Sequence, residues 1–302
     1  MELFKNTDFD FLAKKWWFIL PSLLLILTGL ASVVARGGLL YSIDFKGGAE
    51  MEVRWPETPP IDRIRAVITS DLKGVSVVAA HDLTGSNEVL ISTELPTGKD
   101  LAVLRQTIDQ ALSTITTRYS VRNFEVIGPQ IGADLRRQAL MATAGASGGM
   151  LLYLSHRFRL SYGVAAALAM AHDVLITIGV FSLLHQEISL TVVAALLTLI
   201  GYSMNDTIVV FDRVREDRRI YGREPLAKTI NRSINETLSR TLLTSGLTLL
   251  TALSLLLFGG PVLHGFSLVL VIGIVVGTLS SIFIASPILL FWERCWPAGG
   301  LQ

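Results

Sequence analysis

The chain has 302 residues, of which 51% are hydrophobic and 17% are charged, whereas ordinary soluble domains have about 25% charged residues. Its formal net charge of +1 argues against a nucleic-acid-binding protein, which would present a basic face. The single cysteine, Cys295, excludes an internal disulfide and a thiolate metal cluster. Apolar residues are concentrated in 17–35 and 138–291, while 36–137 has the composition of a soluble protein. The sequence therefore indicates a membrane protein with one domain in water.

Six segments are candidates to cross a bilayer as helices, which takes about 20 mostly apolar residues each. The first, Trp17–Ala35, has an alternative interpretation as a secretory signal, because Ala31–Ala35 loosely resembles a cleavage site. The second is the least apolar, since it is rich in Ala and Gly. After the first, the predicted spans are Gln138–Leu154, Ser161–Leu184, Leu190–Phe211, Thr237–Phe258 and Phe266–Phe291.

Lys and Arg in the short connections predict the orientation of these spans, because they favour the cytoplasmic side. One side has Lys14 and Lys15, several Arg and Lys in 213–232, and Arg294, whereas the loops 185–189 and 259–265 on the other side have none. Both termini are therefore expected in the cytoplasm. The predicted parts are a cytoplasmic N-terminus (1–16), a first transmembrane helix (17–35), a periplasmic domain (36–137), a five-helix transmembrane bundle (138–292) and a cytoplasmic tail (293–302).

In residues 50–128 the spacing of apolar residues no longer indicates transmembrane helices but a mixture of strands and helices. Met51, Val53 and Trp55 alternate with polar residues, as in a half-buried strand. Thr58-Pro59 resembles the start of a helix. The predicted elements are a strand at 51–55, a helix with Ile61, Ile64 and Ile68 on one face that Gly74 closes, strands Val75–Ala79 and Val89–Thr93 joined by a turn at 85–87, a helix over Leu101–Ile115 and a strand Phe124–Ile127. This β-α-β-β-α-β order predicts an α+β, ferredoxin-like domain.

The sequence predicts no enzyme activity, cofactor or metal site. His81-Asp82 is a polar pair without a nucleophile, and no glycine loop precedes a helix with Lys-Ser/Thr. Gly47-Gly48 is better explained as a backbone bend after the first span than as an anion-binding loop.

Ionisable residues inside predicted spans are costly and indicate function by default. Asp206 in the fourth span and Arg240 in the fifth are expected at similar depth, roughly 7 Å and roughly 10 Å from the midplane by the rise of a helix. An ion pair between them is geometrically possible, and a change in their separation would change the proton affinity of Asp206. The alternatives are a static bridge between helices, or an Arg240 that extends to the membrane surface.

Further polar residues accompany this pair. Ser203 and Asn205 add hydrogen-bonding groups to the fourth span, and Thr244 and Thr248 continue one face of the fifth. His172-Asp173 in the third span favours helix packing over a proton relay.

Small residues four apart predict close helix packing. They occur at Gly145 and Gly149 in the second span and at Gly273, Gly277 and Ser281 in the sixth. The basic segment 213–232 is interpreted as a topological anchor near anionic lipid, with docking as the alternative. Asn231 and Asn235 lie in glycosylation sequons that the predicted cytoplasmic location makes irrelevant.

Several motifs occur in order along nearly the whole chain. They are Asp44-Phe-Lys-Gly-Gly48, Ile127-Gly-Pro-Gln-Ile-Gly132, His172-Asp-Val-Leu-Ile176, Gly201-Tyr-Ser-Met-Asn-Asp-Thr-Ile-Val-Val-Phe-Asp-Arg213, Asn235-Glu-Thr-Leu-Ser-Arg-Thr-Leu242 and Gly273–Pro287. Together these motifs resemble those of the SecF family of protein-export membrane proteins, in the SecD/SecF group of the RND superfamily. Two departures are Met204, where Leu is expected, and Leu279, where Tyr is common.

The resemblance implies an RND-type half with six transmembrane helices in the bacterial inner membrane. It implies pairing with SecD, association with the SecYEG channel, YajC as a further candidate partner, and use of the proton gradient to draw unfolded preproteins outward. It also implies a proton-coupling role for Asp206 and Arg240, with Ser203, Asn205, Thr244 and Asp173 as supporting polar residues. The lone half independently predicts a missing partner, since transporter sites form where repeats meet.

Two other functions remain open from the sequence. One is an RND-type small-molecule exporter that acts as a homodimer, although a compact outer domain offers little room for a substrate cleft. The other is an assembly scaffold that holds the translocon together without moving protons.

Overall fold

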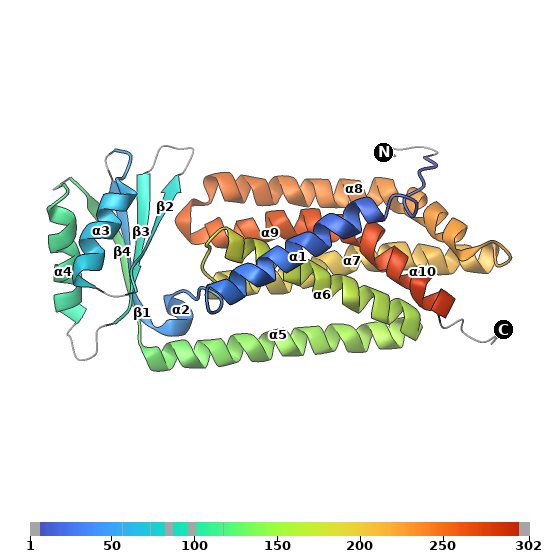
Figure 1. The fold of residues 1–302 in the computed structure, drawn as a ribbon, viewed down its shortest axis with the longest axis horizontal. Helices are drawn as coiled ribbons and strands as arrows, with labels where there is room; N and C mark the ends of the chain where they lie inside the picture. Colours follow the sequence, from blue (N-terminus) through green and yellow to red (C-terminus); the bar gives the residue numbers. More distant parts are fainter. Residues whose placement is uncertain are drawn as a thin grey trace.

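The computed structural model describes residues 7–55, 57–72, 74–81, 87–95, 101–116 and 118–295. A bundle of long helices lies at one end of the elongated molecule, and a small sheet covered by two helices lies at the other (Figure 1). The two parts are joined by the segment after α1 and by the start of α5.

Each of the six predicted segments corresponds to a helix of the bundle, although the helix ends differ from the predicted ones. α5 begins at Pro129, well before the expected 138, because Pro129 occupies the first helical turn, where it costs no hydrogen bond. α7 continues past Phe211 into the predicted cytoplasmic segment, and α8 begins before Thr237. The helices are α1 (Trp16–Ala35), α5 (Pro129–Arg157), α6 (Leu160–Leu183), α7 (Leu190–Ile220), α8 (Leu226–Phe258), and α9 (Gly260–Ser280), which continues through a π-helical turn η1 (Ser281–Ala285) into α10 (Ser286–Cys295).

Five of the described helices are long and apolar enough to cross a membrane: α1, α6, α7, α8 and the continuous helix Val262–Cys295. α5, which contains the predicted span Gln138–Leu154, is not among them. Its many Ala and Gly residues and the charged residues of its first turns lower its hydropathy.

The outer domain is a four-stranded antiparallel sheet in the order β2-β3-β1-β4, with two helices. The predicted element order is confirmed. Its elements are β1 (Gly48–Trp55), α3 (Ile61–Asp71), β2 (Ser76–His81), β3 (Asn87–Thr93), α4 (Leu101–Ser113) and β4 (Ser120–Ile127). α3 begins at Ile61 after Pro60, two residues later than Thr58-Pro59 suggested. The predicted turn at 85–87 lies mostly outside the described residues.

The two faces of the sheet differ. Ala49, Met51 and Val53 of β1 point to the face that α3 and α4 cover, where they are fully buried. This face lies away from the bundle (Figure 1). The alternate residues of β1, Glu50 and Glu52, line a crevice shared with the outer ends of the bundle helices.

Glycines allow the outer domain to join the bundle. The short helix α2 (Ile43–Lys46) ends at Gly47, whose φ of +76° favours glycine. A Cβ on Gly47 would lie 2.7 Å from the Cα of Pro129, and one on Gly132 would lie 2.9 Å from the nitrogen of Gly47. The predicted bend at Gly47-Gly48 is therefore confirmed, and it packs against the first turn of α5.

Close helix packing occurs at some of the predicted glycines and not at others. A Cβ on Gly273 or Gly277 of α9 would collide with Leu199 or Ser203 of α7. By contrast, Gly145 and Gly149 of α5 have open space around them, so the prediction that they pack closely is wrong within this chain. An unpredicted contact joins Gly29 of α1 to the backbone of Gly179 of α6.

Candidate functional site

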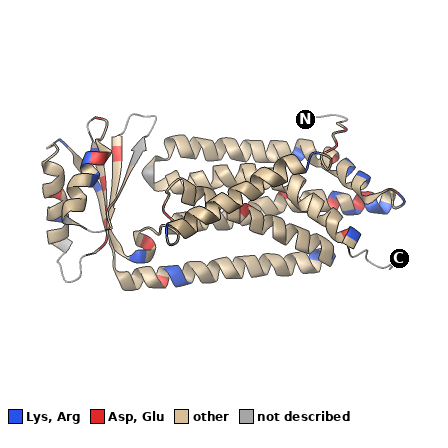
Figure 2. Ribbon diagram, in the orientation of Figure 1, with Lys and Arg blue, Asp and Glu red and all other residues tan. Residues whose placement is uncertain are grey.

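Charged residues of the described chain gather in the outer domain and at the far end of the bundle, while the long middle of the helices has few (Figure 2). Among these few are Asp173 of α6, Asp206 of α7 and Arg240 of α8. Because a charge within a membrane-spanning helix is costly, the surroundings of these residues are the place to look for function.

Asp206 faces the interior between α7 and α8. It is 3% exposed, and Ser245 of α8 donates a hydrogen bond from Oγ to its Oδ2 at 2.8 Å. The described part of the chain contains no ion pair between Asp206 and Arg240 within 4.0 Å, so the ion pair that the sequence made possible is not formed here, and the carboxylate has this hydroxyl partner. A single serine thus connects the buried carboxylate of α7 to α8.

Arg240 lies on an exposed face of α8. Its carbonyl oxygen accepts a hydrogen bond from Thr244 at 3.0 Å, and Thr248 donates in the same way to the carbonyl of Thr244 at 2.8 Å. The predicted polar stripe therefore exists, but these threonine hydroxyls bind their own helix.

Asn205 of α7 is also exposed, and it lines an open hollow of about 380 Å³. Gly149 and Tyr153 of α5 and Gly201 of α7 lie in the same hollow. Polar Asn205 and Arg240 thus lie on the outside of the described chain, at the level where the bundle is otherwise apolar.

A second buried carboxylate, Asp173, joins α6 to α7. Ser203 donates from Oγ to its Oδ2 at 2.5 Å, and Nδ1 of His172 lies 2.9 Å from its Oδ1. Asp173 is 1% exposed. Ser203 and Asp206 are three residues apart on α7, so one face of this helix is held to α6 through Asp173 and to α8 through Ser245.

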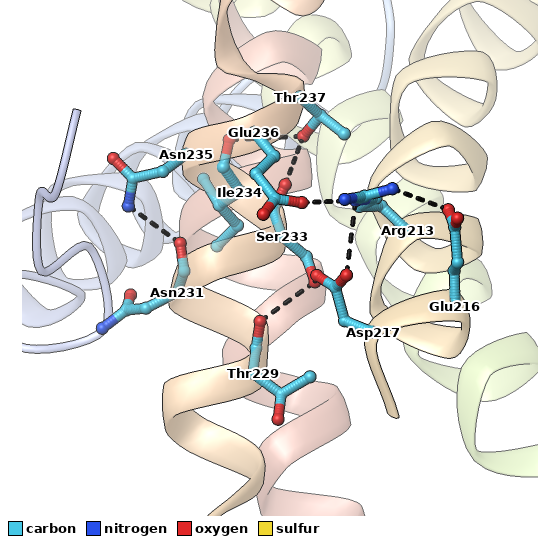
Figure 3. A network of polar contacts seen from close by, with 10 residues as sticks. All are labelled: Arg213, Glu216, Asp217, Thr229, Asn231, Ser233, Ile234, Asn235, Glu236 and Thr237. Atoms are coloured by element: carbon cyan, nitrogen blue, oxygen red, sulfur yellow. Dashed lines mark hydrogen bonds and ion pairs between the residues drawn. The ribbon is translucent and has the colours of Figure 1, made fainter. Parts of the chain in front are cut away.

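A third polar cluster links α7 to α8 toward the end of the bundle that lies away from the outer domain (Figure 1 and Figure 3). Arg213 of α7 binds Glu236 of α8 through a short contact and lies 3.4 Å from Asp217, and Ser233 of α8 donates to Asp217 at 2.6 Å. Asp217 is fully buried. The segment 213–232 was interpreted from the sequence as a membrane-surface anchor, and this clamp was not predicted, because its contacts join residues 16 and 23 positions apart.

The crevice between the outer domain and the bundle is acidic. It holds about 240 Å³, and Glu50, Glu52 and Glu125 of the sheet line it together with Asp44 and Glu187. Ser92 donates to Glu50 at 3.0 Å. Burial, with the negative charges of Glu187, Asp44 and Glu125 nearby, raises the pKa of Glu50 to about 7.

The described residues contain no group of three or more His, Cys, Asp or Glu side chains placed to hold a metal ion. The geometry instead offers buried carboxylates that hydroxyl groups hold at helix–helix contacts. Such an arrangement can bind and release a proton as the helices move, because the protonated and charged forms need different partners.

Comparisons with known proteins agree with the motifs. Residues 107–295 match the family described as protein export membrane protein SecD/SecF, C-terminal. The protein translocase subunit SecF of Koribacter versatilis is 41% identical over 97% of this chain and 94% of its own length. The subunit SecF of Calditerrivibrio nitroreducens is 43% identical over 95% of each chain.

Solved structures of SecDF proteins are also similar to this chain. The crystal structure of SecDF, a translocon-associated membrane protein from Thermus thermophilus, matches 96% of this chain at 38% identity with a TM-score of 0.83. A crystal structure of SecDF in a super-membrane-facing form matches at 37% identity with a TM-score of 0.70. This chain spans only 39% of each of those chains. Family profile, full-length relatives and fold therefore agree that the chain belongs to the SecD/SecF family of protein-export membrane proteins.

Proposed function

We propose that this chain works with a SecD-type partner to couple proton flow to the late steps of protein export across the bacterial inner membrane. The observation that carries the proposal is the buried Asp206, which has a hydroxyl partner on α8, the helix that also carries Arg240. A carboxylate in this position is costly, and an ionisable residue inside a span therefore indicates a function by default.

The proton step is proposed to follow the movement of α7 against α8. With Asp206 against Ser245, the carboxyl has a neutral partner. When the helices shift and the guanidinium of Arg240 approaches, the charged form of Asp206 is favoured and a proton leaves. Each cycle of proton binding and release would thereby drive one cycle of helix movement.

The exposed polar residues support a partner subunit. Asn205 and Arg240 lie on the outside of the chain, where lipid would leave them without hydrogen-bonding partners. The chain also spans 39% of the SecDF chains that it resembles, so the remainder of those chains contains the protein that would cover this face. SecD is the proposed occupant, and SecYEG, YajC and the unfolded preprotein are the further proposed partners.

The proposed architecture is an RND-type half with six spans. α5 is taken as the sixth span because it is 29 residues long and lies along the bundle (Figure 1). The outer domain is taken as ferredoxin-like because its element order and its sheet order are those of that fold. Both termini are placed in the cytoplasm, and 36–137 in the periplasm, by the distribution of Lys and Arg.

The test uses inner-membrane vesicles in which this chain is the sole source of its subunit. We expect Asp206→Asn and Arg240→Met to lower proton-gradient-dependent stimulation of export by at least tenfold while co-purification with SecD is retained. Asp206→Glu, which keeps the carboxyl, is the matched control and should keep part of the stimulation. Full stimulation by Asp206→Asn would exclude the proton role and favour a scaffold. Efflux of a small molecule by the purified chain alone would favour an exporter.

A further inference from the structure

The N-terminal segment is bound to α8 by two asparagine side chains one helical turn apart. Asn235 pairs with both backbone groups of Phe9: it accepts from the amide at 3.0 Å and donates to the carbonyl at 2.9 Å. Asn231 accepts from the amides of Phe11 and Leu12 at 3.1 and 3.2 Å. Figure 3 shows both side chains on the side of α8 that faces the N-terminal trace.

A side-chain contact reinforces this attachment. Asn231 also donates to Asp10 at 2.6 Å, and this bond, with one from the backbone of Ala13, holds the pKa of Asp10 below its ordinary value. Asn231 and Asn235 thus satisfy backbone groups of a segment that has no helix or strand partner of its own.

Aromatic contacts tie the same segment to the continuous helix Val262–Cys295, which contains η1. The ring of Phe11 packs edge-on against Phe283 of η1 at 5.9 Å, and Phe18 of α1 stacks on Phe283 at 3.7 Å. The segment therefore continues into α1 as one attached unit.

The opposite end of α1 is fastened to the start of α7. The chain after α1 exchanges backbone hydrogen bonds with the loop before α7, from Ser42 to Ile188 at 3.0 Å and from Ile188 to Leu40 at 2.6 Å. Asp44 then accepts a hydrogen bond from the amide of Leu190, the first residue of α7, at 2.8 Å. A carboxylate at this position also complements the positive end of the α7 dipole.

Between these two fastenings, α1 packs mainly against α6. At Gly29 and Gly179 its backbone meets that of α6 directly, and near its outer end Ser32 shares a hydrogen bond with Ser182 of α6 at 2.9 Å. Arg36, just after α1, lies 3.3 Å from Nδ1 of His185, just after α6. α1 is otherwise the least buried of the five candidate spans. Most of its surface is therefore free of other helices of this chain, and its ends carry the specific attachments.

We propose that α1 is a strut, fastened to α8 by Asn231 and Asn235 and to the start of α7 by residues 40–44, that transmits relative movement of α7 and α8 to the outer domain. This inference rests on the proposed function, because it needs α7 and α8 to move when Asp206 is protonated. Asn231 and Asn235 are then positioning residues, which act through the N-terminal segment. The twelve residues 36–47, which include the fastened segment 40–44 and α2, join α1 to β1, so a shift of α1 reaches the outer domain through this one connection.

The first experiment removes the attachment. In the full chain assembled with its SecD-type partner, Asn231→Ala/Asn235→Ala should raise amide exchange at Phe11 and Leu12 at least tenfold and lower export stimulation at least fivefold. Lys228→Ala, one turn earlier on α8, is the matched control and should change neither by more than twofold. Released amides with unchanged export would overturn the strut.

The second experiment restores the attachment covalently, which guards against a folding defect in the first. Asp10→Cys and Asn231→Cys are combined with Asn235→Ala and Cys295→Ser, so that oxidation links the segment to α8 through the only two cysteines. We expect the oxidised protein to stimulate export at least fivefold more than the same protein after reduction. Equal stimulation in both states would overturn the strut. Full export stimulation by Asp206→Asn would instead overturn the proposed function and leave the attachment of the N-terminal segment in place.

Discussion

The outer domain and the helical bundle bury different kinds of side chain. Between the sheet and α3 and α4 the interior is apolar, with Met51, Ile64 and Ile108 fully buried. The bundle also buries apolar residues, but hydroxyl and carboxyl groups lie among them. The buried polar residues of the bundle include Asp173, Thr177, Ser203, Asp206, Thr207, Ser233, Thr241 and Ser245.

The difference follows from the solvent on the outside. In water, burial of apolar surface stabilises the fold by about 25 cal/mol per Å². In lipid the outside is as apolar as the inside, so apolar residues do not determine which faces of the helices meet, and close packing at small residues and specific polar contacts do. Substitutions of large apolar residues should therefore damage the outer domain most, and substitutions at glycines and at polar contacts should damage the bundle most.

The largest effect is expected in the outer domain. Ile64 of α3 is fully buried against the sheet, so Ile64→Ala should lower the free energy of unfolding of the domain by about 4 kcal/mol. Hydrogen exchange of the β1 amides in the full chain measures this loss. Val103→Ala on the exposed side of α4 is the control, with an expected change below about 0.5 kcal/mol. Equal losses from both variants would show that the apolar interior does not hold this domain.

The next effect tests glycine packing in the bundle. Gly29→Val should destabilise the chain by about 3 kcal/mol, because the new Cβ would lie 2.4 Å from the Cα of Gly179. Thermal unfolding of the detergent-purified chain measures the loss. The same change at Gly148 of α5, which has open space around it, should leave the unfolding midpoint nearly unchanged. A larger loss at Gly148 than at Gly29 would contradict the packing argument.

The same contrast explains what could be predicted from the sequence. The order of strands and helices in the outer domain was predictable because alternation in β1 and the spacing of Ile61, Ile64 and Ile68 reflect burial against water. Five spans were predictable from length and hydropathy. The ends of α5, α7 and α8 were not, because each helix continues into polar sequence that hydropathy assigns to the connections.

The candidate site was predictable only in part. Asp206 and Asp173 are detectable as charges inside apolar segments, and the structure buries both. Their hydroxyl partners were harder to predict from the sequence: Ser203 was named only as a supporting residue, and Ser245 was missed. A hydroxyl in an apolar helix most often binds its own backbone, as Thr244 and Thr248 do, so residue type alone does not identify Ser245. The asparagines of α8 were considered only as sequons, and their role in binding the N-terminal segment was missed, because their contacts reach more than 200 positions back along the chain.

A pH-dependent effect should appear at the boundary between the two parts. The pKa of Glu50 is about 7 in the folded chain and 4.5 for an ordinary glutamate, so the folded state binds this proton more tightly than the unfolded state does. The contribution of Glu50 to stability is therefore complete below about pH 4.5 and is lost as the pH rises through about 7. We expect the outer domain to lose about 3 kcal/mol over this interval.

Glu50→Gln, which keeps a neutral side chain, should remove this part of the pH dependence and stabilise the domain at pH 8. Hydrogen exchange of β1 and β3 amides at several pH values measures it. Glu52→Gln should act in the same direction and less strongly, because burial also raises the pKa of Glu52 but less of its side chain is removed from water. If the stability of Glu50→Gln falls with rising pH as steeply as that of the unchanged chain, then the crevice between domain and bundle is open to water.

The smallest effect is expected from a comparison of two neighbouring hydroxyl residues of α8, Thr244 and Ser245, whose different roles cannot be told from the sequence. Ser245 donates to the buried Asp206, whereas Thr244 donates to carbonyl oxygens of its own helix. Ser245→Ala should therefore leave a buried carboxyl without its donor and destabilise the chain by about 1–2 kcal/mol, while Thr244→Val should cost less than about 0.5 kcal/mol. Thermal unfolding in detergent compares them, and Ser245→Thr, which keeps a hydroxyl, should recover part of the loss. If Thr244→Val is as costly as Ser245→Ala, then the polar contacts of the bundle stabilise it only through general hydrogen bonding, and the contact between α7 and α8 at Asp206 has no special place in the fold.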